Sequence, residues 1–165
     1  MKKFSTFLLV FIFLAQVAYA DEVMEGLKAL NRGDYKAAFE IWKPLAKKGN
    51  STAQFNLGLM YDKGDGVRQN FPKAFRWYRL AAKQGNVSAQ FNLGLMYYKG
   101  EGVARDYERA VKWYLYAARQ GNIGAQFNLG WMFDKGEGVT PNYKRAIKWY
   151  RLAAEQGYAM AQANL

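Results

Sequence analysis

The sequence repeats itself with a fixed period. The six residues Ala-Gln-Phe-Asn-Leu-Gly occupy positions 53–58, 89–94 and 125–130, so each copy begins 36 residues after the one before it. A partial fourth copy, Ala-Gln-Ala-Asn-Leu, follows at 161–165. A period of roughly 20–50 residues is typical of solenoids, in which each small unit packs against its neighbours in the chain. The period therefore favours an elongated stack of similar units over a fold with one central core.

The first half of each unit has the pattern of an amphipathic helix. In the first full unit, Ala53, Leu57 and Met60 follow one another at i, i+4 and i+7, which places them on one helix face. Gly64 comes next, and glycine readily takes the left-handed conformation that ends many helices. We therefore predict a first helix that ends at the Lys-Gly-Asp-Gly-Val loop, residues 63–67.

The second half of each unit predicts a second helix. Asn70 stands where an N-cap belongs, and Pro72 falls in the first turn, where its missing N–H does no harm. Small alanines then accompany large aromatic residues, a combination that allows neighbouring helices to interlock closely. The predicted inward residues of the three second helices are Ala74, Trp77, Tyr78, Ala81 and Ala82, then Ala110, Trp113, Tyr114, Ala117 and Ala118, then Ala146, Trp149, Tyr150, Ala153 and Ala154. Two antiparallel helices in each unit predict an all-α fold.

Residues 1–20 have the three parts of a signal peptide. Lys2 and Lys3 precede an uninterrupted apolar run, and Ala18-Tyr19-Ala20 places small residues where a signal peptidase cleaves. The run is shorter than the roughly 20 residues that a membrane-spanning helix needs. We therefore predict cleavage after Ala20 and a periplasmic or secreted protein. The chain has no Cys, so disulfides cannot support the exported fold.

Residues 21–50 predict a tetratricopeptide-like hairpin ahead of the longer units. A short helix is expected first, followed by a turn around Gly33 and a helix that Asp34 caps. Pro44 falls inside that second helix and removes one backbone hydrogen bond, so we expect a kink or a local break there.

The repeated motifs resemble a known repeat family. The runs A-Q-F-N-L-G-L-M-Y, K-G-x-G-V and A-x-x-W-Y-x-x-A-A-x-Q-G are similar to the Sel1-like repeat, a relative of the tetratricopeptide repeat. The resemblance implies a right-handed α-solenoid of antiparallel helix hairpins and a role in protein–protein interaction. It places Sel1-like repeats at 51–86, 87–122 and 123–158, which we number repeats 1, 2 and 3. Residues 159–165 would begin an incomplete fourth repeat, either because the sequence is a fragment or because this end pairs with another copy.

The composition argues against an enzyme. The chain has no His and no Cys, which removes the commonest general base, the commonest zinc ligand and all thiol chemistry. After residue 20 the only serines are Ser51 and Ser88, and neither begins the Ser-x-x-Lys motif of serine β-lactamases. The Helicobacter cysteine-rich branch of the family has been linked to β-lactamase activity, but its paired cysteines are missing here. We expect no catalytic residue, no metal and no cofactor, and a β-lactamase-type hydrolase is the least favoured reading.

Comparison of the repeats with one another suggests a binding surface. The frame residues recur unchanged, whereas Leu59, Leu95 and Trp131 occupy one variable position, and Asp62, Tyr98 and Asp134 occupy another. By resemblance to tetratricopeptide helices, such positions line the concave face, and exposed aromatic residues are common binding hot spots. A peptide with apolar and acidic residues would suit this face, although the phenylalanines and Trp131 could equally pack between repeats. The candidate partner-binding residues are Phe55, Leu59, Phe91, Leu95, Tyr98, Lys99, Phe127, Trp131 and Lys135.

The second helices carry a basic face. In repeat 1 it comprises Lys73, Arg76, Arg79 and Lys83, and the formal net charge of the whole chain is +11. Such a charge favours anionic partners, although a solvated helix face has the same appearance. The sequence therefore predicts an exported scaffold that binds a protein or peptide. An anionic envelope polymer on the basic face is the alternative, and neither nucleic acid binding nor an integral membrane protein is expected.

Overall fold

The repeated sequence pattern folds into repeated helix pairs. The computed structural model describes residues 21–165, so the predicted signal peptide lies outside the described residues. Within that range every regular element is an α-helix, beginning with a helical segment at residues 21–31. The helices that follow are α2 (Tyr35–Lys47), α3 (Ser51–Lys63), α4 (Phe71–Lys83), α5 (Val87–Lys99), α6 (Tyr107–Arg119), α7 (Ile123–Lys135), α8 (Tyr143–Glu155) and α9 (Ala159–Ala163).

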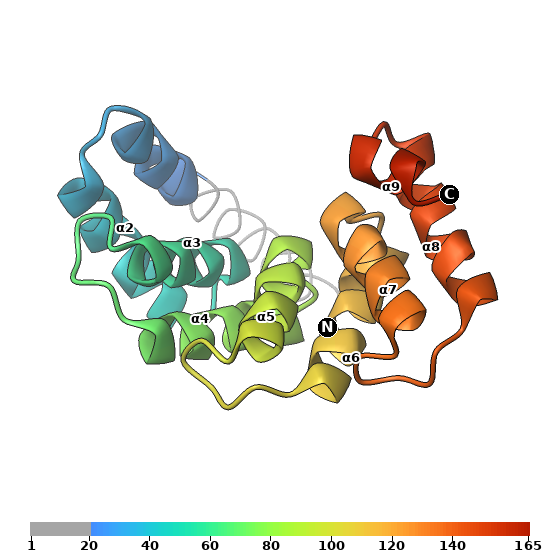
Figure 1. Ribbon diagram of the computed structural model, residues 1–165. Coiled ribbons are helices and arrows are strands. Elements are labelled where there is room, and N and C mark those ends of the chain that lie inside the picture. Colours follow the sequence, from blue (N-terminus) through green and yellow to red (C-terminus); the bar gives the residue numbers. More distant parts are fainter. Residues whose placement is uncertain (1–20) are drawn as a thin grey trace, which may run out of the picture.

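The helix pairs stack in sequence order. The most extensive contacts join α3 to α4, α5 to α6 and α7 to α8, and the next most extensive join each pair to its neighbour. The stack curves into an arch, with α3, α5 and α7 nearer its hollow than α4, α6 and α8 (Figure 1). The all-α solenoid of antiparallel hairpins predicted from the sequence is confirmed.

The same kinds of helix cap recur every 36 residues. The side chain of Asn86 accepts a hydrogen bond from the backbone N–H of Ala89, and Asp106 does the same for Arg109 at the start of the second helix. These caps occupy N–H groups that have no partner inside the helix. Gly100 then ends the first helix with φ 79°, in the left-handed region that glycine enters without strain. The predicted caps Asn70 and Asn142 and the ending glycine Gly64 behave in the same way.

The prediction of a break at Pro44 is wrong. Helix α2 continues through Pro44 to Lys47 without interruption. Proline deletes a single hydrogen bond, and the tertiary contacts of the same turn compensate, because Leu45 and Ala46 are buried against the first part of the chain.

Close packing inside each repeat depends on a glycine that faces a tyrosine. A Cβ on Gly94 would lie 2.7 Å from Cδ1 of Tyr114, and one on Gly58 would lie 2.5 Å from Cδ1 of Tyr78. Both tyrosines are fully buried. The absence of a side chain on the first helix therefore allows the aromatic ring of the second helix to reach the centre of the hairpin.

Buried glutamines link consecutive repeats. The Nε2 of Gln90 donates to the carbonyl of Ala82, and its Oε1 accepts from Nε2 of Gln120 at 2.7 Å. The same pattern recurs at the neighbouring junctions with Gln54 and Gln84 and with Gln126 and Gln156. Because Gln54, Gln90 and Gln126 are buried, these bonds satisfy polar groups that water cannot reach.

Candidate functional site

A pocket of about 320 Å³ lies between repeats 2 and 3. We call it the Trp131 pocket. Helices α5, α6 and α7 supply its walls, which are mainly apolar and aromatic with one amide and one cation. The lining residues are Leu95, Tyr98, Lys99, Tyr114, Phe127, Asn128, Trp131 and Met132. A mostly apolar recess with a few polar groups is the usual form of a binding site.

Tyr98 forms part of one wall and is held from two sides. Its hydroxyl donates to Oε2 of Glu137 at 3.0 Å, which joins α5 to the loop of the next repeat. Its ring lies 5.2 Å from the ring of Tyr107, centre to centre. Partial burial, together with the hydrogen bond to Glu137, raises the pKa of Tyr98. The phenol is therefore neutral at physiological pH and held in a fixed position.

Trp131 is exposed although it belongs to a buried helix. Its side chain is 39% exposed, whereas Met132 next to it is fully buried. The Nζ of Lys135 lies 5.1 Å from the ring centre of Trp131 and 2.9 Å from the carboxylate of Asp134. The Lys135 ammonium thus lies over the Trp131 ring, and the Trp131 side chain also lines the pocket.

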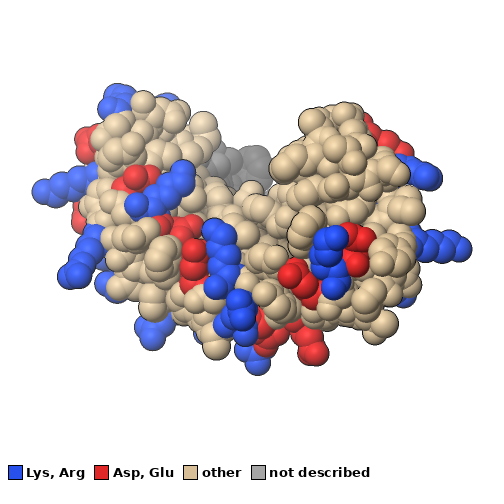
Figure 2. All heavy atoms as spheres, viewed as in Figure 1, with Lys and Arg blue, Asp and Glu red and all other residues tan. Residues whose placement is uncertain are grey.

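Charge is unevenly distributed around the arch. In the view of Figure 2, Lys and Arg side chains project from the outer edges and also lie beside acidic side chains across the middle of the face, whereas the shoulder on the right is largely uncharged. Lys99 is the charged residue among those that line the Trp131 pocket, and its Nζ lies 3.7 Å from Glu101. The pocket therefore combines apolar walls with one positive charge and no carboxylate in its lining.

The structure brings five of the nine candidate residues together in this pocket. They come from two successive first helices, and they are Leu95, Tyr98, Lys99, Phe127 and Trp131. Their common location is a property of the fold, and their contact with a partner stays a prediction.

The other four candidates lie outside the pocket. The rings of Phe55 and Phe91 contact Tyr78 and Tyr114 at 5.8 and 5.9 Å between centres, which is packing within a hairpin. Leu59 is half-buried in repeat 1, where an equivalent wall would need the aromatic residues that only repeats 2 and 3 supply. Lys135 contacts Trp131 from outside the pocket.

The sequence analysis missed three lining residues, Tyr114, Asn128 and Met132. All three recur in every full repeat, so they were assigned to the constant frame. One indication was available: Tyr98 replaces an aspartate that repeats 1 and 3 both carry, at a position facing the second-helix tyrosine.

That replacement changes the surroundings of a buried hydroxyl. In repeat 1 the hydroxyl of Tyr78 donates to Oδ2 of Asp62 at 3.1 Å. In repeat 2 the corresponding hydroxyl, on Tyr114, has no hydrogen-bond partner among the described residues. Burial raises the pKa of Tyr114, and the nearby amide of Asn128 offsets this only in part without completing a hydrogen bond.

A second recess lies between α2 and α4, and we call it the basic groove. Its volume is about 380 Å³, and it combines aromatic and apolar residues with four cations. Lys43 and Lys73 lie over the rings of Phe39 and Tyr61 at 5.2 and 5.1 Å. The groove is lined by Phe39, Lys43, Lys47, Leu57, Tyr61, Lys73, Arg76, Trp77 and Leu80.

Neither a metal site nor a membrane-spanning helix is found in the described part of the chain. Across residues 21–165, no three acidic side chains gather closely enough to hold a metal ion. Over the same range, no helix combines the length and the hydropathy that crossing a bilayer takes.

Comparison with known proteins identifies relatives of the whole repeat array. The family model described as Sel1 repeat matches residues 14–50, 51–86, 87–122 and 123–158. Among solved structures, the chain is similar to a Sel1 repeat protein from Oxalobacter formigenes, with a TM-score of 0.82 and 40% identity, covering 86% of this chain and 58% of that one. No curated protein matched the chain.

Two further structures are similar. A protective antigen present in uropathogenic Escherichia coli strains, which displays an SLR fold, has a TM-score of 0.81 and 37% identity, covering 90% of this chain and 33% of that one. Helicobacter pylori cysteine-rich protein B has a TM-score of 0.63 at 23% identity and shares the fold. The present chain thus spans less than two thirds of the first two of these structures.

Proposed function

Because this chain belongs to the Sel1 repeat family, whose scaffolds fit protein–protein interaction, we propose that it captures a protein partner through the Trp131 pocket. The observation that carries the proposal is the exposed indole of Trp131 at the rim of an apolar recess between two repeats. A partly exposed tryptophan beside a pocket is the kind of anchor that contributes most to protein–protein affinity. Tyr98 belongs to repeat 2 and Trp131 to repeat 3, so the partner would bind at the junction between these two repeats.

The partner would be an extended segment of a protein rather than a large flat surface. A pocket of about 320 Å³ has room for one or two side chains of such a segment. We propose no reaction at this site. The support for a non-catalytic role is the composition, which lacks His and Cys, and failure to turn over a chromogenic β-lactam would agree with it.

The proposed location is outside the cytoplasm. Its support is the order of charged, apolar and small residues in the first 20 positions, which is typical of a secretory signal peptide. Cell fractionation combined with mass spectrometry of the N-terminus would test this. We expect an exported chain that begins at Asp21, and a chain retained in the cytoplasm with residues 1–20 intact would contradict it.

The experiment for the main proposal compares two exposed aromatic residues. Trp131→Ala removes the anchor, whereas Tyr116→Ala removes a side chain that is 42% exposed on α6, outside the pocket. Proteins captured from an envelope extract would be identified, and each would then be purified and titrated. A partner that loses at least tenfold in affinity to Trp131→Ala and keeps its affinity for Tyr116→Ala supports the proposal.

The fold of each variant is checked by far-UV circular dichroism. Equal binding of every purified partner to both variants would contradict the proposed site. Loss of helicity in Trp131→Ala would show that the indole is needed for packing and would also contradict it, because an anchor can be removed without unfolding.

The basic groove favours a second candidate function, the binding of an anionic envelope polymer. Its four cations, Lys43, Lys47, Lys73 and Arg76, take part in none of the ion pairs found among residues 21–165. Unpaired cations beside partly exposed aromatic rings are suited to anionic groups.

A further inference from the structure

We propose that the Trp131 pocket binds an acidic side chain of the partner, whose carboxylate takes the place of the aspartate that repeat 2 lacks. This inference rests on the proposed function and specifies what the pocket recognises. It starts from a row of buried polar contacts that runs through the repeats.

In repeat 1 the tyrosine of the second helix lies between two polar side chains. Tyr78 donates to Asp62 of its own repeat, and Asn92 of the next repeat also acts on its hydroxyl. In repeat 3, burial and the charge of Asp134 raise the pKa of Tyr150 to about 12. An aspartate thus acts on the second-helix tyrosine in both repeat 1 and repeat 3.

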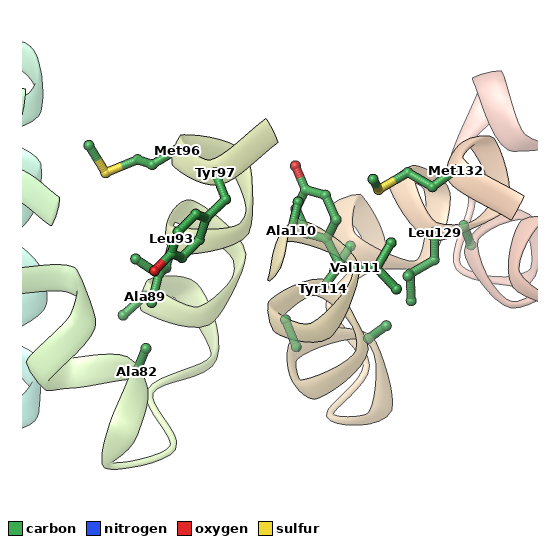
Figure 3. Close-up of a cluster of buried hydrophobic side chains, with 14 of the residues drawn as sticks. Ala82, Ala89, Leu93, Met96, Tyr97, Ala110, Val111, Tyr114, Leu129 and Met132 are labelled. Carbon is green, nitrogen blue, oxygen red and sulfur yellow. The ribbon is translucent and has the colours of Figure 1, made fainter. Parts of the chain in front are cut away.

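The row is interrupted in repeat 2. Tyr98 occupies the aspartate position, and its own hydroxyl turns to Glu137 instead. Tyr114 keeps Asn128 nearby but has lost its carboxylate, and its hydroxyl is buried without a partner. Figure 3 shows the Tyr114 side chain rising from its helix, with its hydroxyl between the segments that carry Tyr97 and Met132.

The same row of polar contacts is also interrupted near the N-terminal end of the described residues, at a place where no cavity is open to a ligand. Trp42 takes the tyrosine position in α2 and donates its Nε1 to the carbonyl of Val23, so Nδ2 of Asn56 is left without a partner. There the space is filled, because even a Cβ on Gly26 would overlap the indole of Trp42. Tyr114 differs in that an open pocket adjoins it.

The missing group has a defined chemistry. A neutral phenol with no acceptor is satisfied best by an anion, because hydrogen bonds to carboxylates are stronger than those to neutral oxygens. Lys99 places a positive charge in the lining, although Glu101 lies 3.7 Å from its Nζ, and the carboxylate of Glu137 is engaged by Tyr98. A glutamate or aspartate of the partner fits this combination, with apolar neighbours against Leu95 and Trp131.

The hydroxyl is covered in the free chain, so the carboxylate must displace a neighbouring side chain to reach it. Asn128 and Met132 line the same pocket, and methionine adapts its shape easily. Binding therefore involves rotation of one of these side chains and no rearrangement of helices.

Two substitutions test the inference from opposite directions. Tyr98→Asp restores the aspartate of repeats 1 and 3, so Tyr114 is satisfied from within the chain. Tyr114→Phe removes the unpaired hydroxyl altogether. The matched control for binding is Tyr78→Phe, which removes a hydroxyl that already has its carboxylate. Tyr98→Phe serves only as the reference for the stability of Tyr98→Asp.

The probes are acetylated hexapeptides with apolar flanks and a central Glu, Asp, Gln or Asn, titrated against the full purified chain. We expect the acidic peptides to bind about tenfold more tightly than their amide counterparts to the natural chain and to Tyr78→Phe. The preference should disappear in Tyr98→Asp and Tyr114→Phe. Tyr98→Asp should also unfold at a higher urea concentration than Tyr98→Phe, because only the former satisfies Tyr114.

The outcomes separate this inference from the proposed function. Peptides that bind through Trp131 without any acidic preference would overturn the inference alone. An acidic preference that survives in Tyr114→Phe would also overturn it, since Lys99 would then be sufficient. If no hexapeptide binds the pocket, both the inference and the proposed mode of capture fail.

Discussion

The hydroxyl of Tyr98 lies 3.0 Å from the carboxylate of Glu137, although the two residues are 39 positions apart. The bond ties the first helix of repeat 2 to the loop of repeat 3, and it fixes one wall of the Trp131 pocket. Five predictions follow from this contact and from others in the stack.

Removal of Glu137 should weaken binding more than stability. Glu137→Ala frees the Tyr98 ring, so we expect the affinity for a partner of the pocket to fall about threefold to tenfold. The free energy of unfolding should change by about 1 kcal/mol or less, because the lost bond is only partly buried. Isothermal titration and urea denaturation measure the two effects. Asp65→Ala, at the same loop position in repeat 1, is the control and should leave affinity unchanged.

Gly94→Ala should destabilise the fold. Alanine is favoured over glycine in a helix by about 1 kcal/mol, but a methyl group 2.7 Å from the Tyr114 ring forces the hairpin apart. Because overpacking costs about 1–3 kcal/mol and the helix gains about 1 kcal/mol, we expect a net loss of up to about 2 kcal/mol in urea denaturation. Ser88→Ala, at an exposed site of the same helix, should be neutral or slightly stabilising. An unchanged midpoint for Gly94→Ala would mean that the helices separate without cost.

Substitution of two glycines by alanine separates the cost of crowding between a loop and the preceding repeat from the cost of backbone strain. Gly138 and Gly121 have φ of 68° and 87°, so alanine strains the backbone at both. A Cβ on Gly138 would also overlap the carbonyl of Tyr107, whereas nothing lies near that of Gly121. Thermal unfolding should therefore show a clearly larger loss for Gly138→Ala than for Gly121→Ala. Equal losses of thermal stability in the two variants would show that the loop moves away from Tyr107 without an energetic cost.

Stability should fall at alkaline pH. Burial raises the pKa of Tyr78 and Tyr114 far above the ordinary value, and burial with the charge of Asp134 raises the pKa of Tyr150 to about 12. Above about pH 10 the tyrosines of the unfolded chain lose protons that the folded chain retains. The unfolded state is then favoured, so the free energy of unfolding decreases as pH rises from about 10 towards 12.

Urea denaturation between pH 8 and 11 would measure this decrease. Tyr150→Phe should reduce the slope of stability against pH above pH 10. Tyr143→Phe, whose ring is 68% exposed, is the control and should leave the slope as it is. A slope that is identical in all three proteins would contradict a role for the buried tyrosines.

Polyanion binding at the basic groove should depend strongly on salt. With dextran sulfate as the polymer, we expect affinity to decrease steeply between 50 and 300 mM NaCl, since salt screens interactions between exposed charges that are more than about 10 Å apart. The double variant Lys73→Ala, Arg76→Ala should bind much more weakly at low salt. Lys28→Ala removes a cation that is paired with Glu25 outside the groove and should have little effect. Binding that is insensitive to salt would exclude this candidate function.

The fold could be predicted because its determinants are local and recur. Gly64, Asn70 and Pro72 each mark a helix boundary by their own backbone chemistry, and the same marks return one period later. Pro44 was misjudged because its effect depends on burial of the surrounding turn, which no local pattern reveals.

The candidate site was only partly predictable for a related reason. Variation between repeats pointed to Tyr98 and Trp131, which do lie at one pocket. It could not point to Tyr114, which is identical in every repeat and becomes distinctive only because its neighbour has changed. The phenylalanines were also ambiguous in sequence, and Phe91 proves to face inward onto that same tyrosine.

The buried glutamines bear on how such a chain could lengthen. Gln90 donates to the carbonyl of Ala82 just as Gln126 donates to that of Ala118, so successive junctions between repeats have the same joint. A duplicated segment of 36 residues would find complementary ends already in place, and the arch would gain one more turn of its curve. Genes of this design can therefore grow or shrink by whole modules, while the one specialised junction at Trp131 is carried along unaltered.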